Sequence, residues 1–412
     1  MLNSMSPKGE TVLDSPALGT GLAELVKPCG DLTRPADPGR VGGRPTFALT
    51  FSGGGFRATL AALGVARYLA DIGRLADVRF ISSVSGGSIA NGVLALQWTE
   101  LRNRGFSSVA LDELVVNPIV DSISRSSLKH ELIRNAWRAV GPRNRTHILA
   151  RCMDRRFFHG RTLTSLDPEY RFVINAANIV TGVRFAFERD VIGDYVTGLA
   201  PSPERLPLAF AAAASAAVPG AFAPLPVPDV GFPCPDSGTP LLLDGGTYDN
   251  TGLQAFDGDQ YADLFLVAMN AGGVFKTGRW GGIPFVKNLM RANSLLYRQS
   301  TGLRTRWMVD RFKARESAEG AGEPVPSWGR LGVLMALASD VKGPAAEQWR
   351  ARFPEHRDWQ GKDLAFVPTV FDRLDRALCR LLVYRGWWLT GATIAARHPN
   401  LARQPSSAPP LG

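Results

Sequence analysis

Two apolar runs near the start of the chain each lead into a glycine-rich turn and then into a segment with helical spacing. Residues 46–51 (TFALTF) and 78–82 (VRFIS) are rich in β-branched and aromatic residues, as expected of buried strands. In the segments that follow, 58–72 and 88–100, apolar residues recur every three or four positions. Because strands alternate with helices, the pattern predicts an α/β fold, with a central, mostly parallel sheet and helices on both faces.

Further apolar runs extend this pattern along the middle of the chain. Residues 171–180, 183–190 and 263–270 read as strands, and the alanine-rich segment 206–217 reads as a helix. We expect parallel strands that are buried on both faces. In such a sheet, functional sites lie at the carboxyl ends of the strands, where the glycine-rich turns are placed.

The turn after residue 82, Ser83 to Gly87 (SVSGG), carries Ser85 at its tip. A serine between a strand and a helix is the context in which a G-x-S-x-G-type pattern marks a nucleophile. Such a turn is strained, so the flanking residues must be small, and Ser83 and Gly86 meet this condition. The Ser85 hydroxyl would also face the amides at a helix N-terminus. The alternative interpretation is an ordinary turn rich in glycine and serine.

The turn after residue 51, Ser52 to Arg57 (SGGGFR), contains the three consecutive glycines Gly53, Gly54 and Gly55. Glycines expose main-chain amides that a substrate oxygen can approach closely. A loose dinucleotide-binding pattern is also present, but it requires an acidic residue at the end of the next strand, and that strand carries none. We therefore favour an oxyanion hole.

A third strand-like run, 241–243, delivers Asp244 into a Gly-Gly turn. A carboxylate within hydrogen-bond reach of a serine can act as its general base. The alternative interpretation is a turn-forming Asp-Gly pair, which is common at strand ends.

Taken in order, the motifs GGGFR (53–57), SVSGG (83–87) and DGG (244–246) resemble those of the patatin-like phospholipases. Segments 172–182 and 211–224 also resemble that family's central strand and the segment before its aspartate. The resemblance covers roughly half of the chain. Its one departure is serine, in place of the usual glycine, at the first position of SVSGG, and serine is still small.

The resemblance implies a lipid acyl hydrolase that uses a serine–aspartate dyad, with no catalytic histidine, no metal and no cofactor. Ser85 would attack the ester carbonyl and form an acyl-enzyme. Asp244 would accept the Ser85 proton and later activate the water that releases the fatty acid. The substrate would be a phospholipid or another lipid ester, cleaved in the manner of a phospholipase A or a lysophospholipase.

The same resemblance implies an oxyanion and substrate-binding group around the glycine loop. The amides of Gly53, Gly54 and Gly55 would hold the oxyanion, with Gly86 beside them. Arg57 would offer positive charge to the oxyanion or to a head-group phosphate. Alternatively, Arg57 ties the loop to a neighbouring carboxylate.

Three other functions are compatible with these motifs. An α/β-hydrolase triad needs a histidine after the acid, and His356 and His398 are available, although neither follows a strand or lies in a glycine-rich turn. An acyltransferase would use the same nucleophile with an alcohol in place of water. A non-catalytic protein that binds membranes or nucleic acid is the third, but it would not explain why both Ser85 and the Asp244 turn are present.

Charge adds information about partners. With 47 Lys and Arg against 37 Asp and Glu, the 412-residue chain has a formal net charge of +10. This charge favours peripheral contact with an anionic membrane, or it reflects a general preference for arginine in the source genome. Nucleic acid is not expected as a partner, because the basic residues lack interleaved aromatic residues.

The four cysteines and the N-terminal segment bear on localisation. Cys29, Cys152, Cys234 and Cys379 are scattered, so we expect reduced or buried thiols, with neither a zinc site nor a disulfide framework. Residues 1–44 contain no continuous apolar run, so we expect no signal peptide or transmembrane helix there. Together these features predict a cytoplasmic protein, peripheral at most to a membrane.

Composition suggests four parts. Residues 1–44 are expected to be a mobile arm, 45–275 the catalytic core with a helical insertion near 112–164, 276–402 a mostly helical part, and 403–412 a disordered tail.

Two long helices are expected in the C-terminal part. They cover residues 285–315, with Leu295 and Leu296 packed on the core, and 372–396, with Trp387-Trp388 buried.

Overall fold

The computed structural model describes residues 29, 40–41, 44–135, 137, 144–228, 230–234, 238–274, 284–355, 361–406 and 409–410. Most of the arm expected over residues 1–44, and part of the tail expected over 403–412, lie outside the described residues.

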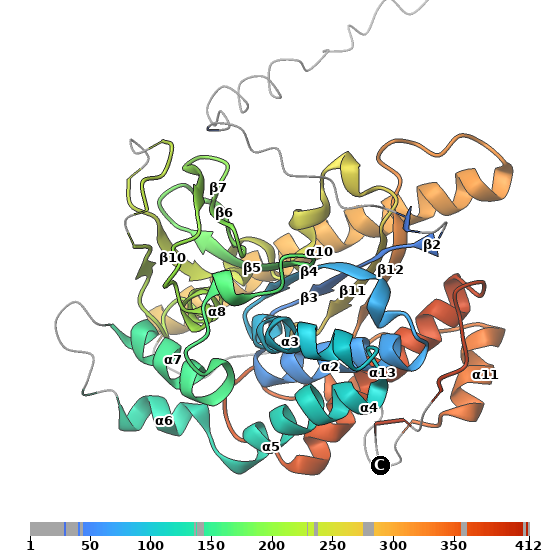
Figure 1. Ribbon diagram of the computed structural model, residues 1–412, viewed down its shortest axis with the longest axis horizontal. Helices are drawn as coiled ribbons and strands as arrows, with labels where there is room; N and C mark the ends of the chain where they lie inside the picture. Colours follow the sequence, from blue (N-terminus) through green and yellow to red (C-terminus); the bar gives the residue numbers. More distant parts are fainter. Residues whose placement is uncertain are drawn as a thin grey trace, which may run out of the picture.

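A ten-stranded mixed sheet runs through the molecule (Figure 1). Its main path is β12 (Leu331–Ala336), β11 (Phe265–Asn270), β3 (Phe47–Phe51), β4 (Val78–Val84), β5 (Arg171–Asn178), β6 (Val183–Phe187), β7 (Val191–Asp194) and β8 (Gly198–Pro201). Strands β12 to β5 along this path are parallel, whereas β6, β7 and β8 are antiparallel to their neighbours. Strand β10 (Leu241–Asp244) pairs antiparallel with both β5 and β9 (Leu225–Pro226).

The predicted α/β class is confirmed, but the expected parallel direction of residues 183–190 is wrong. Strand β6 forms an antiparallel hairpin with β5. The connection through Gly182, which has φ 73°, is too short for the crossover that a parallel strand requires.

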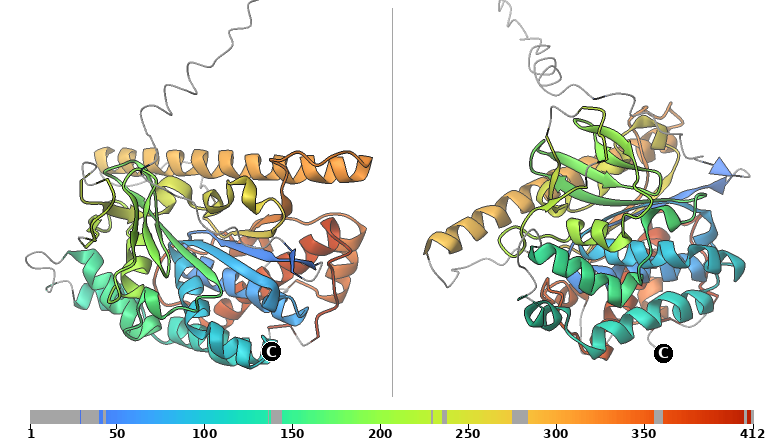
Figure 2. Two further views of the ribbon diagram at one scale, coloured as in Figure 1. Left: turned by 45° about the horizontal axis from the view of Figure 1, so that its top comes forward. Right: turned by 60° about the vertical axis from the view of Figure 1, so that its left-hand side comes forward.

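Helices cover both faces of the sheet (Figure 2). On one face lie α2 (Gly55–Asp71), α3 (Gly86–Asn103) and α13 (Arg376–Arg397), whereas α10 (Pro284–Ala321) covers the other. Because successive side chains of β3 point to opposite faces of the sheet, this strand contributes residues to the cores on both faces. Leu49 and Phe51 join the core beneath α2, α3 and α13, and Ala48 joins a second core with Met308 and Phe312 of α10.

Some residues of α10 that were expected to pack in the core face solvent instead. Leu295 and Leu296 are 51% and 67% exposed, so the prediction that they pack on the core is wrong. Met308 and Phe312 are buried instead. The inward face also carries Tyr297, which reaches the loops at the end of the sheet. A polar residue on the buried side of a helix breaks the hydrophobic periodicity on which the prediction depended.

Helix α13 is buried, as expected of the terminal helix. Trp387 and Trp388 are both inaccessible to solvent, and Trp387 Nε1 donates to Asp71 Oδ2 at 2.7 Å. Helices α2 and α13 approach closely through glycine. A Cβ at Gly64 or Gly386 would lie 2.1 Å from a main-chain oxygen of the facing helix.

Shorter elements complete the fold. They are β1 (Arg40–Val41), β2 (Arg44–Pro45), η1 (Leu75–Asp77), α4 (Ser108–Leu111), η2 (Asp112–Val116), α5 (Asn117–Arg125), α6 (Leu128–Arg134), α7 (Arg145–Met153), η4 (Asp154–Phe158), η5 (Leu163–Ser165), α8 (Leu208–Ser215), α9 (Gly246–Asp249), η7 (Leu253–Phe256), η8 (Asp259–Tyr261), α11 (Pro344–Arg352) and α12 (Gly361–Leu364). None of the helices in the described part of the chain is long and apolar enough to cross a membrane.

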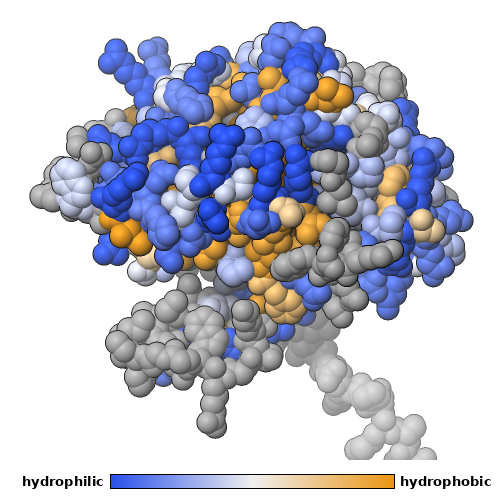
Figure 3. All heavy atoms as spheres, turned by 90° about the horizontal axis from the view of Figure 1, so that it is seen from below, coloured by the Kyte–Doolittle hydropathy of each residue, from blue (hydrophilic) through white to orange (hydrophobic). Residues whose placement is uncertain are grey.

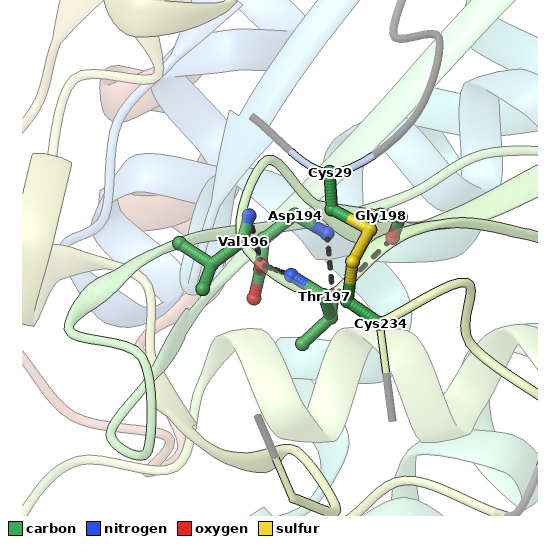
Figure 4. The surroundings of a disulfide bond; sticks show 6 residues. All are labelled: Cys29, Asp194, Val196, Thr197, Gly198 and Cys234. Carbon is green, nitrogen blue, oxygen red and sulfur yellow. Dashed lines mark hydrogen bonds between the residues drawn. A yellow bond between two sulfur atoms is a disulfide. The ribbon is translucent and has the colours of Figure 1, made fainter. Parts of the chain in front are cut away.

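Contrary to the sequence-based expectation, Cys29 and Cys234 form a disulfide (Figure 4). The bond joins the N-terminal segment to the loop between β9 and β10. Both cysteines also contact the turn between β7 and β8, where Cys29 N donates to Tyr195 O and Cys234 N donates to Thr197 O. Asp194 shapes that turn by accepting from the Thr197 amide. The two cysteines are 205 positions apart, so no local spacing could reveal the pair. The other two cysteines are buried free thiols, as expected: Cys152 and Cys379.

Candidate active site

Ser85 occupies a strained turn between β4 and α3. Its backbone has φ 50° and ψ −119°, a conformation that non-glycine residues rarely adopt. The turn fits only because its neighbours are glycines. A Cβ at Gly86 would lie 2.0 Å from the Gly55 oxygen, and one at Gly87 would lie 2.4 Å from the Phe51 oxygen. The predicted nucleophile position is therefore held at the N-terminus of α3.

A serine that sequence reasoning did not identify fixes this turn. The Ser85 amide donates to Ser215 Oγ at 2.8 Å, and Ser215 Oγ in turn donates to Asn175 O at 2.6 Å. Ser215 is the last residue of α8 and also lies 2.9 Å from Ser88 Oγ. The available signal was a single serine within the alanine-rich segment 211–217.

Asp244 lies at the end of β10, opposite Ala176 of β5. Its amide donates to Ala217 O at 2.9 Å, so the segment that follows α8 also holds the aspartate. Its carboxylate accepts a hydrogen bond from the Gly246 amide at 2.7 Å. The Ser85 hydroxyl lies near enough to favour the charged form of this carboxylate. The two residues predicted to form a dyad thus lie close to each other.

Burial sets the charge state of Asp244. The side chain is only 6% exposed, and desolvation raises its pKa to about 6. The Ser85 hydroxyl and the Gly246 amide favour the charged form and offset part of this effect. A carboxylate with this pKa is a stronger base than an ordinary aspartate and is still largely ionised at neutral pH.

The glycine loop provides two amides rather than the three expected. Gly53 N donates to Asn250 O at 3.0 Å, so this amide is engaged within the protein. Among the described residues, no acceptor is found for the amides of Gly54 and Gly55. Both residues have positive φ, of 149° and 60°, and a Cβ at Gly54 would lie 2.4 Å from Ala271 O. Only glycine fits this loop.

Arg57 is buried, and its contacts are those of a structural tie. It is 1% exposed, and its guanidinium donates to the oxygens of Ala271 at 3.0 Å and Val367, and to Thr369 Oγ1 at 2.9 Å. Of the two roles expected, these contacts match the tying of the loop, but the acceptors are carbonyls and a hydroxyl instead of a carboxylate. Burial lowers the pKa of Arg57 to about 10, so it stays protonated at neutral pH.

Two further residues at the site were missed by sequence reasoning. Asn250 is 2% exposed; a Cβ at Gly53 would lie 2.2 Å from Asn250 Oδ1 and 3.2 Å from Ser85 Cβ. Tyr297, from α10, lies with its ring 3.3 Å from the Cβ position of Gly246. Asn250 follows the DGG motif closely and could have been suspected, whereas Tyr297 lies in no motif, 51 positions after the last glycine of DGG (297 − 246).

The triad alternative finds no support at His398. Its Nε2 lies 3.2 Å from Gly332 O, and its ring packs against Phe265 at 4.9 Å between centroids. Among the described residues, no histidine contacts Ser85 or Asp244. The other candidate, His356, lies outside the described residues.

The described residues contain no group of three or more His, Cys, Asp or Glu side chains that could hold a metal ion. A cavity of about 520 Å³ lies between α7 and α8, lined by residues such as Ile148, Arg151 and Phe210, but it includes none of the predicted site residues.

A comparison of the chain with models of known protein families identifies its family. A family model described as patatin-like phospholipase matches residues 49–257, half of the chain. The chain belongs to the patatin-like phospholipase family. The match includes the glycine loop, Ser85 and Asp244, and it ends before α10. Comparison of this patatin-like protein with curated proteins gives no match.

Several solved structures are similar to this patatin-like protein. Human GIVD cytosolic phospholipase A2 is 13% identical, with a TM-score of 0.47, over 87% of this chain and 60% of that one. Its complex with methyl gamma-linolenyl fluorophosphonate has a TM-score of 0.42, again at 13% identity, over 87% and 59% of the two chains. VipD from Legionella pneumophila is 14% identical, with a TM-score of 0.31, over 85% and 72%. The chain thus spans about 60% of the length of the human phospholipase.

Proposed function

We propose that this protein hydrolyses carboxylic esters of lipids, with Ser85 as the nucleophile and Asp244 as the general base. The observation that carries the proposal is the position of Ser85, in a strained turn at the start of α3, close to the buried Asp244 carboxylate, whose pKa is raised by burial to about 6. A serine is activated when a base lies within hydrogen-bond reach. Membership of the patatin-like phospholipase family supports a lipid ester as the substrate.

In the first half of the reaction, Ser85 Oγ attacks the carbonyl carbon of the ester while Asp244 accepts the hydroxyl proton. The carbonyl oxygen becomes an oxyanion, which the amides of Gly54 and Gly55 hold, beside Gly86 at the start of α3. Collapse of this intermediate breaks the bond to the alcohol oxygen. The departing alcohol takes the proton from Asp244, and the acyl group stays on Ser85.

In the second half, a water molecule replaces the alcohol. Asp244 accepts one proton of this water, and the resulting hydroxide attacks the acyl carbon. The same two amides hold the second oxyanion. Collapse releases the carboxylic acid, and the proton returns from Asp244 to Ser85. Neither half requires a metal or a cofactor.

We place this activity at the surface of an anionic membrane, where the substrate is a phospholipid or lysophospholipid. The formal net charge of +10 favours attraction to anionic lipid. On the face shown in Figure 3, apolar side chains gather in a patch bordered by hydrophilic residues. Large apolar side chains that are exposed on the described surface include Ile133, Trp137 and Phe366. Arginine and exposed aromatic side chains together suit a lipid interface.

The Cys29–Cys234 disulfide changes the compartment that we propose. The sequence favoured the cytoplasm, but thiols are kept reduced there, whereas structural disulfides persist in oxidising compartments. We therefore propose that the protein acts on a membrane that faces an oxidising space.

The direct test is acyl release from a panel of phospholipids, lysophospholipids, triacylglycerols and p-nitrophenyl esters. Wild-type protein should release fatty acid from at least one lipid class, and a fluorophosphonate probe should label Ser85. The variant Ser85→Ala should show neither activity nor labelling. Hydrolysis that persists in Ser85→Ala, or wild-type protein that cleaves no ester of the panel, would overturn the proposal.

A further inference from the structure

Helix α10 contributes a side chain to the site even though it lies beyond the residues matched by the family model. The Tyr297 ring lies 3.3 Å from the Cβ position of Gly246, whose amide binds Asp244. Burial and the negative charge of Asp244 both raise the pKa of Tyr297. Its phenol is therefore neutral at physiological pH and can donate a hydrogen bond.

The Asn250 amide points to the same place. A Cβ at Gly272 would lie 3.1 Å from Asn250 Nδ2 and 3.2 Å from Tyr297 Oη. Asn270 Oδ1 lies close by, but it already accepts from the Gly272 amide at 3.0 Å. Two donors thus converge beside a residue that has no side chain to separate them.

One of the two donors is buried without a partner. Asn250 Nδ2 forms no hydrogen bond within the described part of the chain. Tyr297 Oη lies beside the same position at Gly272. A buried donor left unsatisfied costs about 1–3 kcal/mol, so such groups in a native protein require an explanation. An acceptor supplied by a ligand would provide it.

We propose that Asn250 Nδ2 and Tyr297 Oη form a donor pair that binds an oxygen of the alcohol part of the lipid, either a glycerol ester oxygen or a phosphate oxygen. The inference rests on the proposed ester hydrolysis at Ser85. The ester carbonyl is taken by the amides of Gly54 and Gly55, and an acyl chain offers no acceptor. The acceptor must therefore come from the alcohol side of the scissile bond.

This pair would make the enzyme selective for esters whose alcohol carries further oxygens. The scissile ester would be fixed at Ser85 and oriented by a second, polar contact beside Gly272. One of the two donors comes from α10, so the C-terminal part of the chain would help to select the substrate for a site built by residues 49–257.

The test compares two substrates, a diacyl phospholipid in mixed micelles and p-nitrophenyl butyrate, whose alcohol has no glycerol or phosphate oxygen. Tyr297→Phe removes only the hydroxyl and keeps the ring against Gly246. It should lower kcat/KM about tenfold on the phospholipid, the effect of one lost hydrogen bond, and severalfold less on the nitrophenyl ester. Asn250→Ala should show the same preference. The double variant should lose less than the product of the two single losses, because both donors hold one acceptor.

The control is Tyr384→Phe, which removes a phenol on α13 that donates to Pro354 O and should leave both activities unchanged. Equal losses on the two esters, or no loss in Tyr297→Phe, would overturn the donor pair while leaving ester hydrolysis at Ser85 intact. Failure of the proposed function looks different, because the wild-type protein would then cleave neither ester.

Discussion

The main-chain amide of Gly53 donates a hydrogen bond to the carbonyl oxygen of Asn250 at 3.0 Å. This bond joins the glycine loop after β3 to the loop after Asp244, although the two residues are 197 positions apart (250 − 53). Ser85 sits beside these loops, with its Cβ 3.2 Å from the Cβ position of Gly53. This main-chain contact therefore holds the candidate nucleophile, base and oxyanion amides in fixed positions relative to one another.

The acid side of the pH profile should reflect Asp244. As the general base it must be ionised, so kcat/KM should fall as the pH drops through about 6, the value to which burial raises its pKa. An unperturbed aspartate would place this limb near 3.9. Measurement of kcat/KM between pH 4 and pH 9 on a soluble ester locates it.

This limb alone does not separate a dyad from a triad, because a histidine base would titrate near 6.5. The variants His398→Ala and His356→Ala make the distinction, since each should leave the limb where it is. A limb that stays near 6 in Asp244→Asn, with substantial activity, would contradict the assignment.

The same pKa predicts a stability effect. Because the pKa of Asp244 is raised in the folded state, the protonated side chain stabilises the fold at low pH. This stabilisation is lost as the pH rises through about 6, where the group ionises. Asp244→Asn removes the titration. Its free energy of unfolding, relative to wild type, should rise by about 2 kcal/mol between pH 4 and pH 8. Urea denaturation at the two pH values measures this difference, and a constant difference would show that Asp244 titrates normally.

Gly54→Val should cost both activity and stability. From the sequence alone, valine is expected to block the approach of substrate to the amides while leaving the fold intact. In the structure, a Cβ at Gly54 would lie 2.4 Å from Ala271 O, and the φ of 149° strains any side chain. We expect a loss of at least ~10²-fold in rate and a lower Tm. Gly302→Ala, in an open position on α10, is the matched control and should leave activity unchanged.

Reduction of the Cys29–Cys234 bond should destabilise the protein. Loss of a native disulfide typically lowers the free energy of unfolding by about 2–4 kcal/mol. Denaturation of the wild type with and without reductant measures the effect. The double variant Cys29→Ser/Cys234→Ser should match the reduced wild type and show no further response to reductant. A wild type that is indifferent to reductant would argue against the bond.

Local patterns were enough to find the family's motifs and the turns that carry the candidate site residues. The glycine loop and the turn around Ser85 are short segments whose strand–turn–helix context is visible in the sequence, and Asp244 follows a clear apolar run. Their proximity depends on the sheet. Ser85 follows the parallel strand β4, whereas Asp244 ends β10, which is antiparallel to β5, so the parallel α/β pattern alone did not bring the two together. The buried terminal helix with Trp387 was predictable in the same way, from apolar periodicity.

Contacts between distant segments were not predictable. The Cys29–Cys234 bond spans 205 positions, and the engagement of the Gly53 amide depends on where the Asn250 loop folds back. Tyr297 lies on a helix whose apolar pattern gave the wrong inward face, since Leu295 and Leu296 turn to solvent. The position of a polar side chain at a functional site is set by the geometry of that site, so hydrophobic periodicity does not predict it.

The most direct test of the Ser85–Asp244 dyad is a double-mutant comparison of esterase activity. Residues that act as one catalytic unit have non-additive effects, so kcat/KM for Ser85→Ala, Asp244→Asn and the double variant should fall to a similar residual value. This residual activity would come from the amides of Gly54 and Gly55 and from substrate binding. His398→Ala, measured alongside, should retain activity within a few-fold of wild type. An Asp244→Asn variant that stays folded and keeps near-wild-type kcat/KM, while Ser85→Ala is inactive, would contradict the dyad.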